Sequence, residues 1–90
     1  MTTDRVQRLQ SALETRFSPI ELRIKDQSHL HVGHAGASDG RGHFDIRIIS
    51  AVFGGKSRIQ RHRMVYDAVH DLMQSDIHAL RITALAPGET

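Results

Sequence analysis

The chain has no cysteine and no tryptophan, and aromatic residues make up only 4% of its 90 residues. Without cysteine it can form no disulfide, and it offers no thiol nucleophile or thiolate metal ligand. Any soft-metal chemistry in which it takes part must therefore take its sulfur from a partner. No apolar run approaches the roughly 20 residues that span a bilayer, and the N-terminus lacks the apolar stretch of a secretory signal. We expect a cytoplasmic protein without a membrane segment.

Catalytic motifs are also missing. The sequence contains no GxSxG nucleophile motif, and no pair of carboxylates stands in a pattern that predicts a cleft. The segment GGKS at 54–57 resembles the end of a phosphate-binding loop, but the full motif needs a glycine at position 50, where this chain has Ser50. A chain of this length is expected to form one domain, 1–90, with little room for a substrate pocket. We therefore expect a binding module and not an enzyme.

Hydrophobic periodicity predicts two helices and three strands. Apolar residues recur every three or four positions in two segments, and they alternate with polar residues in three others. The predicted helices cover residues 4–17 and 57–73, and the predicted strands cover residues 20–26, 43–50 and 77–85. The order αββαβ indicates a single α+β domain with a three-stranded sheet and helices packed on one face, in which the first two strands pair antiparallel.

Two of these segments also predict which side chains are buried. The residues of the first strand that are expected to face the core are Ile20, Leu22 and Ile24. The residues expected on the buried stripe of the second helix are Ile59, His62, Val65 or Tyr66, Val69, and Leu72 or Met73. Ser57 is the expected N-cap of that helix. His62 is thus predicted to be a core imidazole, whereas His70 lies off the stripe and should be exposed.

Positive charge gathers at the start of the second helix. Four cations, Lys56, Arg58, Arg61 and Arg63, fall within eight residues that contain no acid. The helix dipole disfavours cations at this end, so helix stability does not explain them. They form either a solvated face or a surface that docks an anion, a nucleic acid or a partner.

Histidines gather in and around the segment between the first two strands. Four of the seven histidines, His29, His31, His34 and His43, lie in or next to a glycine-rich stretch, and His78 opens the last strand. Imidazole suits zinc, copper and iron, but no cysteine or carboxylate completes a familiar ligand set here. Spacing alone leaves both polar filler and a metal site open.

Several segments together resemble the BolA-like family. They are GHAGA at 33–37, HF at 43–44, FGGKSRIQRHRMVY at 53–66 and IHAL at 77–80. The resemblance covers nearly the whole chain, and it implies an αββαβ fold similar to a type II KH domain. The GxxG loop with which KH domains hold nucleic acid is broken at 54–57, so that mode of RNA binding is not expected.

The resemblance also implies a function. Similar proteins partner monothiol glutaredoxins and share a bridging 2Fe-2S cluster, with sulfur from the glutaredoxin cysteine and its bound glutathione. The histidine ligands implied for this chain are His34 and His78, with His29, His31 and His43 as alternates. Other family members are DNA-binding regulators of morphology and stress, and for that alternative the expected contact residues are Lys56, Arg58, Arg61 and Arg63. A homodimer stays open.

Overall fold

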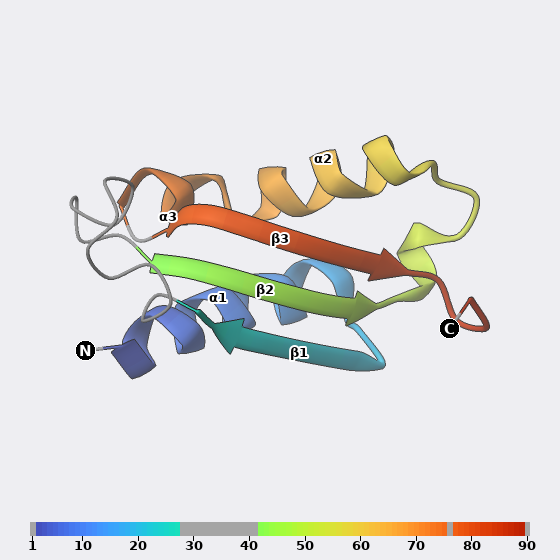
Figure 1. Cartoon of the computed structure of the whole chain (residues 1–90). Helices are drawn as coiled ribbons and strands as arrows, with labels where there is room; N and C mark the ends of the chain where they lie inside the picture. The colour runs from blue at the N-terminus through green and yellow to red at the C-terminus, as the bar shows by residue number, and fades with distance from the viewer. Residues whose placement is uncertain (1, 28–41, 76, 90) are drawn as a thin grey trace.

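The computed structural model describes residues 2–27, 42–75 and 77–89. Its elements follow the order helix, strand, strand, short helix, two helices and strand (Figure 1). They are α1 (Thr2–Phe17), β1 (Glu21–Asp26), β2 (Gly42–Ile49), the 3₁₀ turn η3 (Ala51–Phe53), α2 (Arg58–Ala68), α3 (His70–Ser75) and β3 (Ile77–Leu85). The predicted strands are confirmed to within one residue at each end.

The three strands form one sheet in the order β1-β2-β3. β1 and β2 are antiparallel, with Ile24 opposite Ile46. β2 and β3 are parallel, with Ile46 opposite Ile82. Parallel neighbours need a crossover connection, and η3, α2 and α3 provide it. Because β2 and β3 run in the same direction, both begin at the same end of the sheet.

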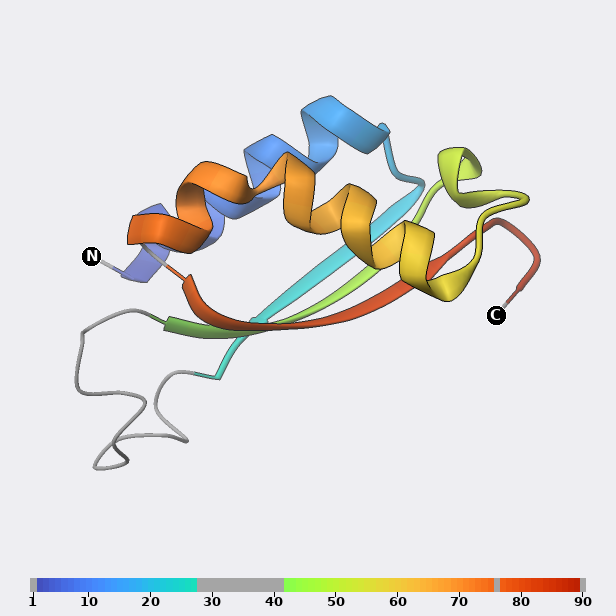
Figure 2. The same cartoon turned by 90° about the horizontal axis from the view of Figure 1, so that it is seen from above.

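All helices pack on one face of the sheet (Figure 2). Alternation along the strands sends Phe44, Ile46 and Ile48 toward the helices, where they are buried. The rest of the buried core is Leu9, Leu13, Phe17, Phe53, Val65, Val69, Ile77, Leu80, Ile82 and Ala86. The structure therefore confirms the predicted α+β fold with helices on one face.

The second predicted helix is divided in two. It begins as predicted, because Ser57 caps it and exchanges side-chain-to-backbone hydrogen bonds with Gln60 in a capping box. It ends at Ala68, however, and Val69 leaves helical geometry with φ −113° and ψ 20° before α3 begins. Val69 stays buried at this bend. No proline or glycine marks the break, so periodicity predicted one continuous helix.

Three predictions of burial were wrong. Ile59 is 65% exposed and Ile20 is 72% exposed. Ile20 precedes β1, whose register with β2 starts at Glu21, so no residue of β2 lies opposite it. His62 is half-buried at the edge of the helix layer and is not part of the core. His70 is exposed, as predicted.

Ser50 connects three elements at the end of β2. Its side chain is 1% exposed, and its hydroxyl donates to the Phe17 carbonyl oxygen at 2.6 Å. The same oxygen accepts a hydrogen bond from the Val52 amide at 3.3 Å, and the Ser50 amide donates to the Leu85 carbonyl at 3.0 Å. One buried hydroxyl thus ties the end of α1 to the start of η3.

Replacing Ser50 with alanine should therefore destabilise the domain. The change leaves the buried Phe17 carbonyl without its donor, which costs about 1–3 kcal/mol, and urea unfolding monitored by far-ultraviolet circular dichroism measures the loss. Ser11→Ala, at an exposed position of α1, is the matched control and should change stability by less than about 0.5 kcal/mol. Equal stability of the two variants would contradict this role for Ser50.

Candidate functional site

A β-bulge at the start of β2 and β3 brings two histidines together. Gly42 lies opposite Ile77, but His43 lies opposite Ala79, so the register shifts and His78 is the extra residue on β3. A bulge of this kind redirects a side chain and is common beside functional sites. Regular alternation would send the His78 side chain to the same face as Leu80, which is in the core. The bulge aims His78 at His43.

The two imidazoles are direct neighbours. Their ring centroids lie 5.0 Å apart with the ring planes tilted by 46°. Both side chains are half-buried, and the Nε2 atom of His43 is buried. Metal–nitrogen bonds of about 2 Å allow two neighbouring rings to bind the same ion. The arrangement can therefore supply two nitrogen ligands from two strands.

Two ligands do not complete a metal centre. In the described ranges, no group of three or more histidine, aspartate or glutamate side chains is placed to hold a metal ion. A 2Fe-2S cluster needs four ligands, and two histidines with two sulfurs form a known set. The histidine pair fits the nitrogen half of such a set, and the two sulfurs would have to come from elsewhere because this chain has no cysteine.

The predicted ligands divide between described and undescribed parts of the chain. His78 is placed at the bulge, next to His43, which the sequence had marked only as an alternate. His34, His29 and His31 lie outside the described residues, so their role stays a prediction. No sequence signal pointed to His43 over the others, because its closeness to His78 depends on the parallel register and the bulge.

Arg61 is the one member of the basic group that the structure ties into the fold. Its guanidinium binds both carboxylate oxygens of Glu89, at 2.6 and 2.9 Å. It also donates to the carbonyl oxygens of Lys56 and Ala84, each at 3.0 Å. Its side chain is 12% exposed, so Arg61 is held between α2 and the C-terminal end of β3, and its role in DNA contact stays a prediction. The sequence did not predict the Arg61–Glu89 ion pair, because the two residues are 28 positions apart.

The other three basic residues remain on the surface. Lys56, Arg58 and Arg63 are all exposed. Lys56 and Arg58 line a shallow groove between the start of α2 and the last half of β3. The turn before them depends on Gly55, whose φ of 74° is unfavourable for other residues. The capping box already satisfies the helix start, so this segment is a helix-entry turn.

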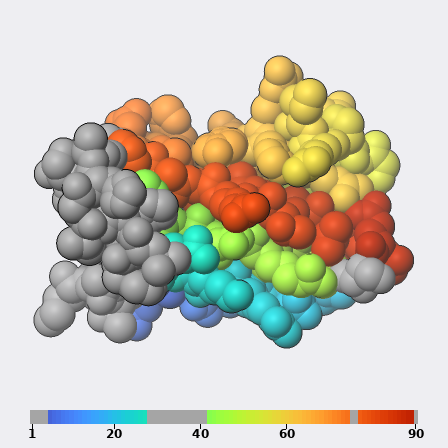
Figure 3. All heavy atoms as spheres, viewed as in Figure 1, coloured from blue at the N-terminus to red at the C-terminus, as the bar shows by residue number. Residues whose placement is uncertain are grey.

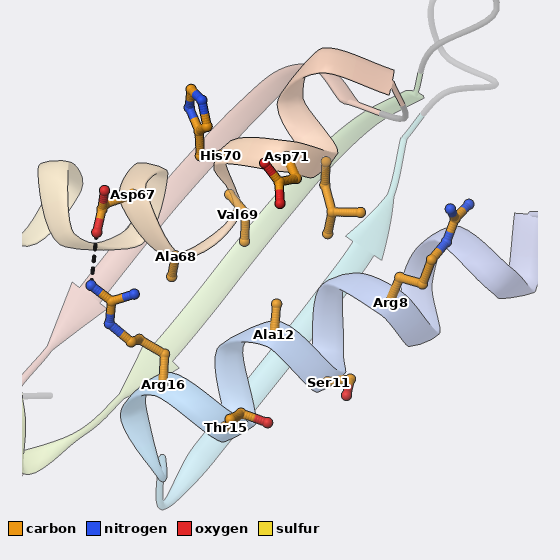
Figure 4. A pocket seen from close by; sticks show the side chains of 11 residues that line it. Arg8, Ser11, Ala12, Thr15, Arg16, Asp67, Ala68, Val69, His70 and Asp71 are labelled. Carbon is orange, nitrogen blue, oxygen red and sulfur yellow. Dashed lines mark hydrogen bonds and ion pairs between the residues drawn. The ribbon is translucent and has the colours of Figure 1, made fainter.

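A wider cleft separates α1 from the bend between α2 and α3 (Figure 4). Ala12, Ala68 and Val69 line its apolar part, and an ion pair between Arg16 and Asp67 spans it at 2.7 Å. None of the predicted ligand or DNA-contacting residues lines this cleft. The Arg16–Asp67 ion pair links α1 to the end of α2, apart from the histidine pair.

The Arg61–Glu89 pair predicts a specific pH dependence of stability. Hydrogen bonds from Arg61 and then from the Ala86 amide lower the pKa of Glu89 from 4.5 to about 2. A lowered pKa stabilises the fold fully above the ordinary value, and that stabilisation is lost as pH falls through the lowered one. Glu89→Gln should therefore melt at a lower temperature than wild type at neutral pH, and the difference should shrink between pH 4.5 and about 2.

Thermal unfolding followed across this pH range tests the pair. Glu14→Gln, at an exposed position of α1, controls for the loss of one negative charge. A difference between wild type and Glu89→Gln that stays constant or grows as the solution becomes acidic would contradict the assignment.

Among the described residues, no helix is long and apolar enough to cross a membrane.

Comparison with known proteins gives the family. The BolA model, described as "BolA-like protein", matches residues 13–89. Protein BOLA1, chloroplastic, of Arabidopsis thaliana is 36% identical over 90 residues, which cover 97% of this chain and 56% of that protein. The "DNA-binding transcriptional regulator BolA" of Haemophilus influenzae is 31% identical over 81 residues, covering 90% of this chain and 76% of that one.

A further relative is known as a sequence and as a solved domain. SufE-like protein 1, chloroplastic/mitochondrial, of Arabidopsis thaliana is 42% identical over 87 residues, covering 91% of this chain and 24% of that protein. The chain therefore spans about a quarter of this relative and about half of BOLA1. The names of both plant relatives place them in organelles, so a cytoplasmic location stays a prediction. The solved BolA domain of SufE1 superposes with a TM-score of 0.83 at 41% identity, covering 93% of both chains. The chain belongs to the BolA-like family.

Proposed function

We propose that this chain is a non-enzymatic binding module that shares a bridging 2Fe-2S cluster with a monothiol glutaredoxin, in iron–sulfur trafficking or iron sensing. The observation that carries the proposal is the histidine pair at the bulge, where His43 and His78 lie 5.0 Å apart. The cluster would supply one-electron chemistry and a group that can pass between proteins. This chain would supply nitrogen ligands for one iron.

The chemistry of the two partners is complementary. This chain has imidazoles and no thiol. A glutaredoxin with bound glutathione offers two sulfurs, so it need not supply a histidine. Replacing thiolate by imidazole on one iron lowers the negative charge around the cluster and raises its reduction potential. A cluster held in this way depends on both proteins, which suits transfer or sensing better than permanent storage.

His78 is the better-fixed ligand of the pair. It sits inside β3, between buried Ile77 and exposed Ala79, and the bulge determines its direction. The second nitrogen comes from His43 or from His34. The position of His43 beside His78 supports it as the second ligand, whereas His34 is supported by the family resemblance alone.

Single substitutions distinguish these ligands. His78→Ala should abolish the visible circular dichroism that is specific to the cluster-bound complex, because it removes one of the two proposed imidazole ligands of the iron. Comparing His43→Ala with His34→Ala then identifies the second ligand as the variant with the larger spectral change. Each variant is reconstituted anaerobically with the same glutaredoxin and glutathione.

His70→Ala is the matched control, since His70 is an exposed imidazole on α3 whose Nε2 lies 3.1 Å from the Gln74 amide nitrogen. It should leave the spectrum unchanged. Far-ultraviolet spectra of all variants should match wild type, which separates ligand loss from unfolding. A wild-type cluster spectrum from His78→Ala with the partner bound would contradict the proposed ligand.

DNA binding is the second candidate function. The relative named as a DNA-binding transcriptional regulator supports it, and so do the exposed cations Lys56, Arg58 and Arg63 around α2. Contacts of this kind are made chiefly to phosphates, carry little sequence information and weaken steeply with salt. We rank this function second because Arg61, the fourth member of the group, is held by Glu89.

A further inference from the structure

The face of the sheet opposite the helices carries an excess of positive charge. Alternation and register place eleven residues on this face. They are Glu21, Arg23 and Lys25 on β1, His43, Asp45, Arg47 and Ile49 on β2, and Ala79, Arg81, Thr83 and Leu85 on β3. Four of the eleven are cationic and two are acidic, whereas the whole chain has a formal net charge of only +2.

The arrangement of these charges costs stability. Arg23 lies directly opposite Arg47 on the neighbouring strand, and like charges in this position destabilise a sheet. Both arginines share the single carboxylate of Glu21, at 3.7 Å from Arg23 and 2.9 Å from Arg47. One carboxylate therefore forms ion pairs with two guanidinium groups, and the Arg23 side chain remains 70% exposed.

The next set of paired residues across the sheet also carries more positive than negative charge. Asp45 is flanked in register by Lys25 on one side and Arg81 on the other, and both cations are exposed. A shallow hollow lined by Arg23, Lys25, Asp45, Arg47 and Thr83 lies across both sets of paired residues. Packing does not require these cations, because their side chains point away from the core.

No described helix covers this charged face, which is continuous with the histidine pair (Figure 2). Figure 3 shows residues of β1, β2 and β3 side by side at the surface, and the described helices all lie behind them. His43 belongs to the same face, on the same strand as Asp45 and Arg47. A partner that covered the face would therefore also reach the proposed ligands.

We infer that this charged sheet face docks an acidic protein surface, and that Arg23, Lys25 and Arg81 attract and orient it beside His43. The inference rests on the proposed function in that the partner is the protein that completes the metal site. A protein fits better than nucleic acid, because open sheets that bind single strands stack bases on aromatic side chains. His43 is the only residue with a ring among the eleven.

Two triple variants with identical charge changes test the docking surface. R23Q/K25Q/R81Q removes one lysine and two arginines from the sheet face, and K56Q/R58Q/R63Q removes one lysine and two arginines from the exposed basic group around α2. Binding to the monothiol glutaredoxin is measured by calorimetry at low and high salt, with chelator present so that no cluster forms. The sheet-face variant should bind about tenfold more weakly at low salt and show a flatter salt dependence, while the helix variant should bind like wild type.

Other outcomes overturn the inference. Unchanged binding by the folded sheet-face variant, or a larger loss for the helix variant, would place docking elsewhere. A sheet-face variant that keeps the glutaredoxin but loses a DNA duplex would show that the face serves nucleic acid. If wild type binds the glutaredoxin but the complex never yields a cluster spectrum, the proposed function is refuted and docking stands. If a cluster spectrum forms but the two proteins do not bind each other in the presence of chelator, docking alone is refuted.

Discussion

The parallel pairing of β2 with β3 is the constraint on which the rest of the structure depends. Parallel neighbours must be joined by a crossover, so α2 and α3 pass behind the sheet and join α1 on the same face. None of the described helices covers the other face (Figure 2). The same pairing starts both strands at one end of the sheet, where the register shift sets His78 beside His43. Core, charged face and histidine pair all follow from one strand pairing.

A small domain of this design separates stability from function. Buried strand side chains such as Ile46 and Ile82 belong to the core beneath the helices, and Ser50 links α1 to η3 at the far end of the layer. The face away from the helices carries opposed arginines that this core does not require. Substitution of its exposed charged residues should therefore leave the fold intact.

Much of the fold could be predicted because its signals are local. Alternation in β1, β2 and β3 gave their positions to within one residue, and Ser57 correctly predicted the start of α2. The bend at Val69 could not be predicted, since no proline or glycine marks it and the apolar periodicity continues through it.

The candidate site was only partly predictable for a related reason. His78 followed from the family resemblance, but its neighbour His43 depends on a register shift between strands 35 residues apart in sequence. Arg61 was assigned to a surface group, yet Glu89, 28 residues away, holds it in an ion pair. In the sequence, the cations of the charged sheet face appear only as the polar residues of three alternating segments. That they gather on one face follows from the pairing of all three strands, which the sequence does not show.

The central claim is that imidazole nitrogens of this chain bind iron in the shared cluster. The most direct measurement is pulsed electron paramagnetic resonance of the reduced complex, with this chain labelled with ¹⁵N-histidine and the glutaredoxin unlabelled. The account predicts strong ¹⁵N couplings that disappear from the His78→Ala complex and persist in His70→Ala. A reduced cluster bridging the two proteins without strong ¹⁵N couplings would contradict it.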